Sequence, residues 1–356
     1  MNIRAWTVQV PGQPMVRSER DEDAREGEVI VKVAGCGVCH TDLGFHFEGV
    51  PTRHAFPLTL GHEISGKVVA AGPGAENWLG KAVVVPAVIP CGTCAACRAG
   101  RGSVCPKQIF PGNDVHGGFA DHVRVPARGL CTVPDLADPK INKAGIDLAT
   151  LSVVADAVTT PYQAIHRSGL QSGDLAVFVG IGGVGGFGVQ IAKARGAKVV
   201  AIDVDPERLR RIESFGADLA LDARQNDFKA IRAAIRGLAK RNDIPGFRQR
   251  IFETSGTAAG QNTAFGLIEH GGYLSVVGFT PDKVTLRLSN VMAFDATVQG
   301  NWGCLPEHYP AVVGLCVDGA VKIAPFVQKR PLSAINETFD DLHQHRLTQR
   351  PVLVPD

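Results

Sequence analysis

Residues 175–185 read LAVFVGIGGVG, an apolar run that leads directly into a glycine-rich turn. The run at 175–179 is apolar throughout, which is typical of a strand buried in a parallel sheet. The pattern G-x-G-x-x-G at 180–185 lets the pyrophosphate of a dinucleotide approach the free N–H groups at the start of a helix. That helix is expected near residues 184–195, and a second strand is expected at 198–203. The sequence therefore predicts a βαβ unit of a Rossmann-type, doubly wound parallel sheet.

Asp203 ends the second expected strand, about 20 residues beyond the turn, where a dinucleotide site places an acidic residue on the ribose. A carboxylate there would accept hydrogen bonds from the ribose hydroxyls and repel a 2′-phosphate, which favours NAD over NADP. The turn residues expected to contact the cofactor are Gly180, Gly182, Gly183, Val184 and Gly185. The sequence thus predicts NAD as the cofactor.

The length and composition favour a globular protein of two domains, since 356 residues exceed the ~100–200 of a single domain. Lysine and arginine total 37 and aspartate and glutamate total 35, a formal charge of +2 that provides no general attraction to nucleic acid or anionic membranes. No apolar run reaches the ~20 residues of a membrane-spanning helix, and the N-terminus shows no apolar signal-peptide core. We therefore expect a cytoplasmic protein with no nucleic-acid or membrane partner.

Turn signals cut the first part of the chain into short strand-like runs, such as residues 28–33 and 66–70, which is typical of a mostly β domain. Strand candidates at residues 250–253 and 273–277 instead extend the parallel sheet. The expected fold class is α/β, with a Rossmann-type domain and a mostly β domain. The expected boundaries are 1–157 for the β domain, 158–301 for the Rossmann domain and 302–356 for a return to the first domain.

One basic stretch, from Lys229 to Arg250, stands out in an otherwise balanced chain. The ordinary interpretation is the solvated face of a helix and a loop. The alternative is an edge that binds the phosphates of a bulky anionic substrate. The sequence leaves both interpretations open.

The nine cysteines, an odd number with Cys-x2-Cys spacing, favour thiolate–metal chemistry over disulfides. Four of them follow the pattern C-x2-C-x2-C-x7-C, namely Cys91, Cys94, Cys97 and Cys105. This spacing can place four thiolates tetrahedrally around one Zn²⁺ at ~2.3 Å each, which makes a closed and therefore structural site. An iron–sulfur cluster also takes four thiolates and is the competing interpretation. The sequence predicts a metal-binding loop at residues 91–105.

Two shorter motifs upstream offer ligands for a second metal. Residues 37–42 read GVCHTD and contain the thiol of Cys39, and residues 61–63 read GHE and contain the imidazole of His62. Either motif alone is weak, because a buried cysteine is usually only a small apolar side chain.

These motifs, the four-cysteine loop and the glycine turn follow one another in the order found in zinc-dependent medium-chain alcohol dehydrogenases, which the chain resembles over nearly its whole length. The resemblance implies a GroES-like catalytic domain at residues 1–157, with a catalytic zinc held by Cys39 and His62 and a structural zinc held by the four-cysteine loop. The cofactors that it implies are therefore NAD and two zinc ions per subunit.

The same resemblance implies roles for five further side chains. Asp42 orients the histidine ligand and fixes its tautomer, while Thr41 hydrogen-bonds the substrate oxygen and can pass on its proton. Glu63 sits behind the metal. Arg208 flanks the adenosine ribose, with a salt bridge on the surface as the alternative, and Arg350 contacts the pyrophosphate.

The sequence departs from the family pattern at two places. Residues 156–162 read DAVTTPY where many relatives read CGVSTGY, so Asp156 stands in the place of the third ligand, a cysteine. A carboxylate keeps the charge of a thiolate but donates less electron density, which leaves zinc the stronger Lewis acid. The alternative is that Asp156 is a capping residue and that Glu63 fills the site. Gly44 stands where many relatives have the histidine that carries the proton to solvent, and His46 is either its substitute or a surface residue of a loop.

The run at residues 156–164, the aspartate ligand and the missing histidine resemble the 6-hydroxycyclohex-1-ene-1-carbonyl-CoA dehydrogenases of anaerobic benzoyl-CoA degradation. This resemblance implies NAD-dependent oxidation of the alicyclic, allylic alcohol of a CoA thioester to a ketone. The alternatives are a general zinc alcohol dehydrogenase acting on simple or cyclic alcohols, and a non-catalytic protein that binds zinc and nucleotide. Relatives form dimers and tetramers, so we expect a homodimer or homotetramer, and the alternating residues 283–288 could pair across a subunit interface.

Overall fold

The computed structural model describes every residue from 1 to 356, and the chain divides into two compact units. The first comprises Met1–Thr159, Gly303–Gly319 and Ile323–Asp356, and the second comprises Thr160–Trp302 and Ala320–Lys322. Residues 320–322 lie in the second unit, where the Gln190 side chain hydrogen-bonds both the N–H and the C=O of Lys322. No helix of the chain is long and apolar enough to cross a membrane.

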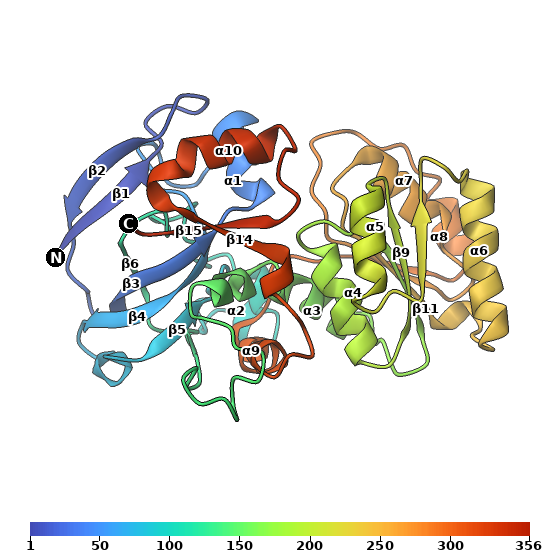
Figure 1. Cartoon of the computed structure of the whole chain (residues 1–356), viewed down its shortest axis with the longest axis horizontal. Coiled ribbons are helices and arrows are strands. Elements are labelled where there is room, and N and C mark those ends of the chain that lie inside the picture. The colour runs from blue at the N-terminus through green and yellow to red at the C-terminus, as the bar shows by residue number, and fades with distance from the viewer. The chain divides into compact units, whose positions relative to one another are not determined.

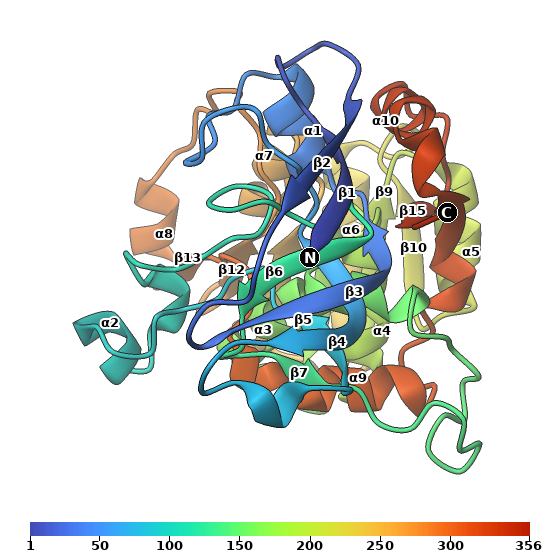
Figure 2. The same cartoon turned by 90° about the vertical axis from the view of Figure 1, so that its left-hand side faces the viewer.

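A seven-stranded mixed sheet forms the first unit, with the strand order β14-β15-β3-β4-β5-β7. The strands are β3 (Glu28–Gly37), β4 (Glu63–Ala71), β5 (Ala82–Val85), β6 (His122–Pro126), β7 (Cys131–Thr132), β14 (Val327–Pro331) and β15 (Arg350–Val354). β6 pairs with the first half of β3, while β15 pairs with its last two residues. A separate antiparallel hairpin consists of β1 (Asn2–Thr7) and β2 (Val16–Asp21). Figure 2 shows β3, β4 and β5 side by side.

The central strand β3 determines where the ends of this sheet meet. Most of its apolar residues are buried, and Val29, Val31 and Val33 belong to the core cluster of the unit, while Lys32 is its one exposed residue. Its register with β4 places Gly37 opposite Glu63. The residues just beyond the end of β3 therefore lie close to those just before the start of β4.

The first unit also contains short helices (Figure 1). They are α1 (His40–Phe47), α2 (Ala95–Arg98), α9 (Tyr309–Val317) and α10 (Ile335–His343). Short 3-10 turns occur at η1 (Glu76–Trp78), η2 (Gly102–Val104), η3 (Thr150–Ala155), η5 (Pro306–His308), η6 (Ala324–Phe326) and η7 (Leu332–Ala334). Phe339 of α10 belongs to the same apolar cluster as Val31 and Ile64 of the sheet, so this helix closes the core of the unit.

The second unit is built on a six-stranded sheet, in the order β10-β9-β8-β11-β12-β13, in which every pair is parallel. The strands are β8 (Leu175–Val179), β9 (Lys198–Asp203), β10 (Leu219–Asp222), β11 (Gln249–Glu253), β12 (Tyr273–Val276) and β13 (Thr297–Gly300). The strands predicted at residues 175–180, 198–203, 250–253 and 273–277 are β8, β9, β11 and β12. The Rossmann-type sheet predicted from the glycine turn is confirmed.

Helices flank this sheet, as Figure 1 shows on its right-hand side. They are α3 (Thr159–Arg167), α4 (Gly185–Ala194), α5 (Pro206–Glu213), α6 (Phe228–Arg241), α7 (Ala258–Gly266) and α8 (Ser289–Ala293), with the 3-10 turn η4 (Gly246–Arg248). Ile231 and Ile235 of α6 and Phe265 of α7 share one apolar cluster with Val177 and Ile251 of the sheet, so α6 and α7 cover the same face. The alternating segment 283–288 forms no strand within the chain, and the edge strands of the sheet are β10 and β13.

Candidate functional site

A buried cluster of four potential metal ligands lies where β3 and β4 meet. It consists of Cys39, His62, Glu63 and Asp156, whose ligand atoms all lie within 4.8 Å of one another. The Sγ atom of Cys39 is 4.0 Å from Oδ2 of Asp156, and Nε2 of His62 is 3.6 Å from the same oxygen. Ligands at ~2.0–2.3 Å around a tetrahedral Zn²⁺ are separated from one another by about 3.3–3.8 Å. A zinc ion therefore fits between these three side chains.

The electrostatic surroundings of the His62 imidazole also favour a bound metal ion. The ring is buried, with Nδ1 3.3 Å from a carboxylate oxygen of Asp42 and Nε2 3.6 Å from one of Asp156. Burial lowers the pKa of His62, but the carboxylates of Asp42 and Asp156 raise it, and the net pKa lies well above its usual range. A cation is thus favoured at this point of the interior, and a soft thiolate, an imidazole and a carboxylate together are a donor set that zinc accepts.

Asp42 connects the two segments that carry the thiol and the imidazole. Its Oδ2 accepts the N–H of Cys39 at 2.9 Å, and its Oδ1 accepts the N–H of Gly61 at 3.2 Å. The same Oδ1 lies 3.3 Å from Nδ1 of His62. This is the arrangement by which a carboxylate orients a histidine ligand from behind. The hydroxyl of Thr41 lies 3.7 Å from the Cys39 sulfur.

Glu63 is fully buried and forms a bidentate ion pair with Arg350, with both N···O distances at 2.7 Å. Its Oε1 also accepts the N–H of Ala157 at 2.9 Å. The pair fits because Gly37 has no side chain, and a Cβ atom there would lie 2.0 Å from Oε2 of Glu63. Because three donors already hold the Glu63 carboxylate, the geometry favours Asp156 over Glu63 as the third ligand.

Arg350 is the site residue whose surroundings sequence reasoning missed. The resemblance implied a contact with the cofactor pyrophosphate, which stays a prediction, and in the structure its guanidinium is buried on Glu63. Burial lowers the pKa of Arg350, but Glu63 and Cys39 raise it, so the net pKa is raised further above its already high range. Arg350 begins β15, and only the placement of β15 against β3 brings it to Glu63. No local sequence pattern contains that information.

The four-cysteine loop forms a second cluster of ligands. The sulfur atoms of Cys91, Cys94, Cys97 and Cys105 lie within 4.8 Å of one another. Individual Sγ···Sγ distances are 3.5 Å between Cys94 and Cys97 and 3.7 Å between Cys94 and Cys105. Four thiolates at ~2.3 Å around one ion are expected about 3.8 Å apart. The backbone N–H of Thr93 and then its hydroxyl lower the pKa of Cys91 to about 5, which favours the thiolate that metals bind.

The glycine turn lies between β8 and α4, as the sequence predicted. Gly180 has φ +88°, and a Cβ atom there would lie 2.4 Å from the backbone of Ser255, so this position excludes other residues. At Gly182 the nearest atom to such a Cβ is a guanidinium nitrogen of Arg208, at 3.7 Å. Gly182 therefore leaves room for close approach to the helix N-terminus, while Arg208 provides a cation beside it. Arg208 also lies 3.5 Å from Asp205.

Asp203 ties the end of β9 to the glycine turn. Its Oδ2 accepts the N–H of Ile181 at 2.7 Å, and its Oδ1 accepts the N–H groups of Val204 and Asp205 at 2.8 and 2.9 Å. The carboxylate is thus held rigidly at the end of β9, next to the turn. Its second lone pairs stay available to hydroxyl donors, because each carboxylate oxygen can accept more than one hydrogen bond.

The structure corrects the expectation for His46. The residue belongs to helix α1 and is 3% exposed, so it is neither on a loop nor on the surface. Its ring packs edge-on against Phe47 and Phe339, and burial lowers its pKa. At Gly44 a Cβ atom would meet Val50 at 3.3 Å. His46 therefore serves as a buried core residue, and the geometry provides no support for a proton relay through it.

Three arginines of the basic stretch form ion pairs within the second unit. Arg232 and Arg236 of α6 both pair with Glu269, and Arg248 pairs with Asp174. The opposite side of α6 buries Ile231 and Ile235 against the sheet. These contacts indicate that the basic stretch is the solvated face of a helix and a loop, and they argue against a phosphate-binding edge.

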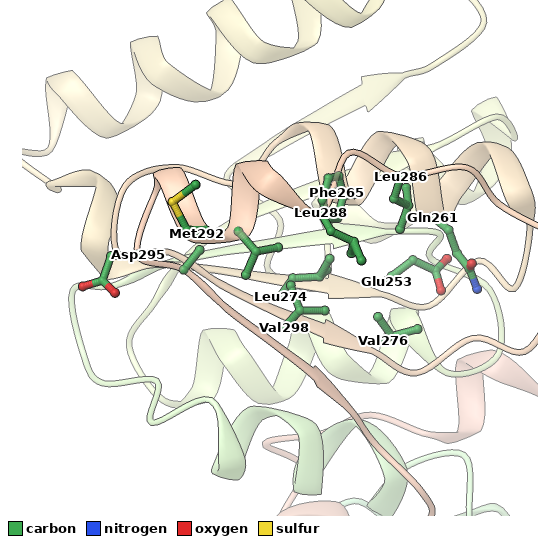
Figure 3. Close-up of a pocket in the computed structure, with 12 residues that line it drawn as sticks. Glu253, Gln261, Phe265, Leu274, Val276, Leu286, Leu288, Met292, Asp295 and Val298 are labelled. Atoms are coloured by element: carbon green, nitrogen blue, oxygen red, sulfur yellow. The ribbon is translucent and has the colours of Figure 1, made fainter.

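An apolar hollow of about 570 Å³ lies along the edge strand β13 and contains neither metal cluster nor the glycine turn. Figure 3 shows Phe265, Leu274 and Leu288 gathered at its centre, with Met292 near one end. Leu288 and Met292 are 72% and 76% exposed, unusually large values for such side chains.

The second unit has a nucleotide-binding turn on a parallel sheet, and the first has a buried thiolate–imidazole–carboxylate cluster. These two features together are typical of a metal-dependent, nicotinamide-linked dehydrogenase. Residues 25–135 match the family described as "Alcohol dehydrogenase GroES-like domain", and residues 183–318 match "Zinc-binding dehydrogenase". An alcohol dehydrogenase of Geobacillus stearothermophilus is 31% identical over 331 residues, which cover 92% of this chain and 91% of the relative.

Solved structures agree with this similarity. The alcohol dehydrogenase of the hyperthermophilic archaeon Aeropyrum pernix is 28% identical, with a TM-score of 0.84 over 99% of this chain and 100% of that one. An alcohol dehydrogenase of Thermotoga maritima is 25% identical, with a TM-score of 0.87 over 100% of both chains. The chain belongs to the zinc-dependent medium-chain alcohol dehydrogenase family. It is an NAD-dependent oxidoreductase of the alcohol dehydrogenase kind, with the GroES-like and Rossmann-like domains of that family.

Proposed function

We propose that this protein oxidises a secondary, alicyclic and allylic alcohol to a ketone, with NAD as the acceptor and with one catalytic zinc held by Cys39, His62 and Asp156. The observation that carries the proposal is the buried ligand set, in which Asp156 lies 3.6 Å from His62 and 4.0 Å from Cys39. In the net reaction the alcohol carbon gives a hydride to C4 of nicotinamide, and the hydroxyl proton leaves to solvent.

Each residue of the cluster has a separate task in this proposal. Zinc, when bound there, supplies positive charge that favours the substrate alkoxide over the alcohol. The Thr41 hydroxyl, 3.7 Å from the Cys39 sulfur, accepts the substrate proton and passes it outward. Asp42 holds the imidazole of His62 in one tautomer through its contact with Nδ1 at 3.3 Å. Glu63, neutralised by Arg350, holds the backbone that follows Asp156.

A single-turnover experiment with NAD and a panel of alcohols distinguishes the proposed enzyme from a non-catalytic protein that binds zinc and nucleotide. We expect the unaltered enzyme to form NADH. The Asp156→Ala variant should form none and should contain one zinc fewer per chain. NADH formation at the unaltered rate by a zinc-replete Asp156→Ala variant would remove Asp156 from the ligand set. Absence of turnover with every alcohol would favour the non-catalytic alternative.

We also propose that the chain binds a second, structural zinc in the four-cysteine loop. The Sγ···Sγ distances of 3.5–3.9 Å match those expected for a closed tetrathiolate site. Elemental analysis should find two zinc ions and no iron per chain. Stoichiometric iron would favour the iron–sulfur alternative for this loop.

A preference for NAD over NADP follows from Asp203, whose carboxylate is held beside the glycine turn by three N–H donors. The negative charge repels a 2′-phosphate. Replacing Asp203 by Gly should narrow the ratio of catalytic efficiencies for the two cofactors, whereas Asp205→Asn, a change in the same loop, should alter it much less. Equal efficiencies in the unaltered enzyme would contradict the assignment.

The physiological substrate that we propose is a 6-hydroxycyclohex-1-ene-1-carbonyl-CoA thioester, oxidised at its ring alcohol to the conjugated 6-oxo enone. The proposal rests on the resemblance at residues 156–164 and on Gly44 in place of the usual histidine. The paired arginines of α6 give it no further support. The test compares the catalytic efficiency for the thioester with those for ethanol and cyclohexanol. Comparable efficiency for simple alcohols would favour a general alcohol dehydrogenase.

Finally, we propose that the chain forms a homo-oligomer, a dimer or tetramer, in which a second copy covers the hollow along β13. The exposed Leu288 and Met292 lie beside this edge strand, whose outer backbone groups have no partner strand within the chain. Met292→Glu should shift the sedimentation of the protein toward a smaller species. Leu79→Glu, which changes an exposed leucine of the first unit, is the matched control. Sedimentation of Met292→Glu identical to that of the unaltered protein would contradict this interface.

A further inference from the structure

One buried tyrosine lies next to the ligand cluster without being part of it. Tyr309, the first residue of α9, is 0% exposed. Its hydroxyl donates to the carbonyl oxygen of Ala155 at 2.5 Å and accepts the N–H of Ala87 at 3.2 Å. The hydroxyl of Thr159 donates to the neighbouring carbonyl of Asp156 at 3.4 Å. A phenol placed fully inside the protein is stabilised by such partners, because an unpaired hydroxyl there would be unfavourable.

The carbonyl that Tyr309 holds belongs to the residue directly before Asp156. Asp156 follows the 3-10 turn η3 and has φ −142° and ψ −60°, outside the regular helix and strand conformations. No repeating hydrogen-bond pattern therefore fixes its backbone. The direction of its side chain depends on how the two neighbouring peptide groups are held.

Both of those peptide groups are held by buried polar side chains. The planar group between Ala155 and Asp156 is anchored at its carbonyl by Tyr309. The next planar group, between Asp156 and Ala157, is anchored at its N–H by Glu63 at 2.9 Å. Since peptide groups are rigid planes, fixing the two planes fixes the φ and ψ angles between them. Those angles set the direction of the Cα–Cβ bond from which the Asp156 carboxylate extends.

We propose that Tyr309 is a positioning residue for the catalytic metal site, in which its hydroxyl, together with the Glu63 carboxylate, fixes the backbone of Asp156 and so aims this ligand at Cys39 and His62. The inference rests on the proposed function in one respect, the assignment of Asp156 as a zinc ligand. Tyr309 does not contact the metal, the substrate or the cofactor in this proposal. It acts only through Asp156.

The four-cysteine loop provides an internal control, because it forms a separate ligand cluster in the same unit and the Tyr309 hydroxyl bonds to Ala155 and Ala87, outside that loop. General destabilisation of the unit would weaken both metal sites. Loss of positioning at Asp156 would weaken the Cys39–His62–Asp156 site alone. Outer groups that orient metal ligands typically change metal affinity by about 10–100-fold when removed.

The experiment compares Tyr309→Phe with Tyr273→Phe in the full-length protein. Tyr273 is a matched control because its buried hydroxyl also makes a 2.5 Å hydrogen bond, to Gln299 in the second unit. Zinc retention is measured by elemental analysis across a series of chelator concentrations. The visible absorption spectrum after replacing the catalytic zinc by Co²⁺ reports the ligand geometry. We expect Tyr309→Phe to lose one zinc at about 10–100-fold lower chelator concentration and to shift the cobalt spectrum, while Tyr273→Phe matches the unaltered protein.

Unchanged zinc retention and an unchanged cobalt spectrum in Tyr309→Phe would overturn the inference, and so would equal weakening of both zinc sites. If Tyr309→Phe does not fold, Thr159→Val tests the same idea, that buried hydroxyls aim Asp156 by holding the peptide groups on either side of it, since the Thr159 hydroxyl donates to the carbonyl of Asp156 at 3.4 Å. A shifted cobalt spectrum in that variant supports the inference, and an unchanged one overturns it. Failure of the underlying ligand assignment is recognised separately, because Asp156→Ala would then keep the cobalt spectrum of the unaltered protein.

Discussion

The two ligand clusters of the first unit are assembled in opposite ways. In the four-cysteine loop, the most distant ligands, Cys91 and Cys105, are 14 positions apart in the sequence. In the buried cluster, Cys39 and Asp156 are 117 positions apart. The first cluster can close through its own short loop, whereas the second exists only after the sheet has formed. Sequence spacing is therefore sufficient evidence for one site and insufficient for the other.

Burial follows the same division. Cys91, Cys94 and Cys97 are partly exposed, and the loop brings few charged groups into the interior. The buried cluster instead gathers three carboxylates, a histidine, a thiol and the Arg350 guanidinium, of which Asp156 is the most exposed at 18% of its side chain. Such a set is stable only when each charge is paired or bound to a metal. The local site should thus contribute mainly to stability, and the long-range site mainly to catalysis.

The largest expected effect comes from Cys39→Ser, which removes a ligand of the long-range cluster. Turnover should fall by about 10³-fold or more, because the loss of several kcal/mol of charge stabilisation at the reacting oxygen raises the barrier accordingly. One zinc per chain should be lost, with a much smaller change in thermal stability. Cys131→Ser, a buried cysteine outside both clusters, is the control. Turnover close to that of the control would end the functional distinction between the two clusters.

Arg350→Met tests whether the buried cluster depends on its ion pair. The variant leaves the Glu63 carboxylate buried without its bidentate partner, which should lower the free energy of unfolding by about 3–5 kcal/mol. Denaturant unfolding measures the change. Adding Glu63→Gln to Arg350→Met should restore part of the loss, since the buried charge is then removed. An unfolding free energy of the single variant within 1 kcal/mol of the unaltered value, on the scale of an exposed ion pair, would mean that this pair is dispensable.

Cys94→Ser should act on the local cluster in the reverse sense to Cys39→Ser. The loop loses its metal, and the unfolding free energy should fall by about 3 kcal/mol, the scale of an entropic constraint on a loop of this length. Turnover measured well below the unfolding midpoint should change little. The decisive comparison is between Cys94→Ser and Cys39→Ser, for each of which the change in turnover is set against the change in unfolding free energy. A collapse of turnover in folded Cys94→Ser would assign the loop a catalytic role.

The smallest expected effect concerns the segment that leads to His62. The N–H of Thr59 donates to Nδ1 of His116 at 3.2 Å, and burial, Arg20 and His54 lower the pKa of His116 to about 4. In the unfolded chain a histidine has a pKa of about 6.5. The unfolded state then binds more protons below this value, so stability is lost as the pH falls from about 6.5 towards 4.

His116→Gln keeps an acceptor for Thr59 and removes this titration. The unfolding free energy of the variant should therefore vary less steeply with pH between 4 and 6.5, by at most about 1.4 kcal/mol per pH unit. Chemical denaturation at a series of pH values measures the slope. Identical slopes in the variant and in the unaltered protein would show that His116 titrates normally.

Local sequence patterns predicted much of the fold and many of the residues of the site. The run at residues 175–185 predicted β8, the turn and α4, because a buried strand and a glycine turn each leave a local signature. The four-cysteine spacing predicted a cluster that the structure contains. The local sequence was ambiguous at His46, which the structure places in a buried helix instead of a surface loop, whereas the pairing of residues 283–288 across a subunit interface stays a prediction. A histidine in an apolar helix and an alternating segment have the same appearance whether they are buried or exposed.

The sequence by itself determined the parallel sheet, the nucleotide-binding turn, the four-cysteine loop and the family of the chain, since each depends on residues close together in the sequence. Only the tertiary structure decided that Arg350 pairs with Glu63 and that Tyr309 reaches the carbonyl of Ala155. These contacts join residues 287 and 154 positions apart. Their formation depends on which strands and helices pack together, because the apolar core of the first unit, formed by residues from both ends of the chain, brings the polar side chains into contact.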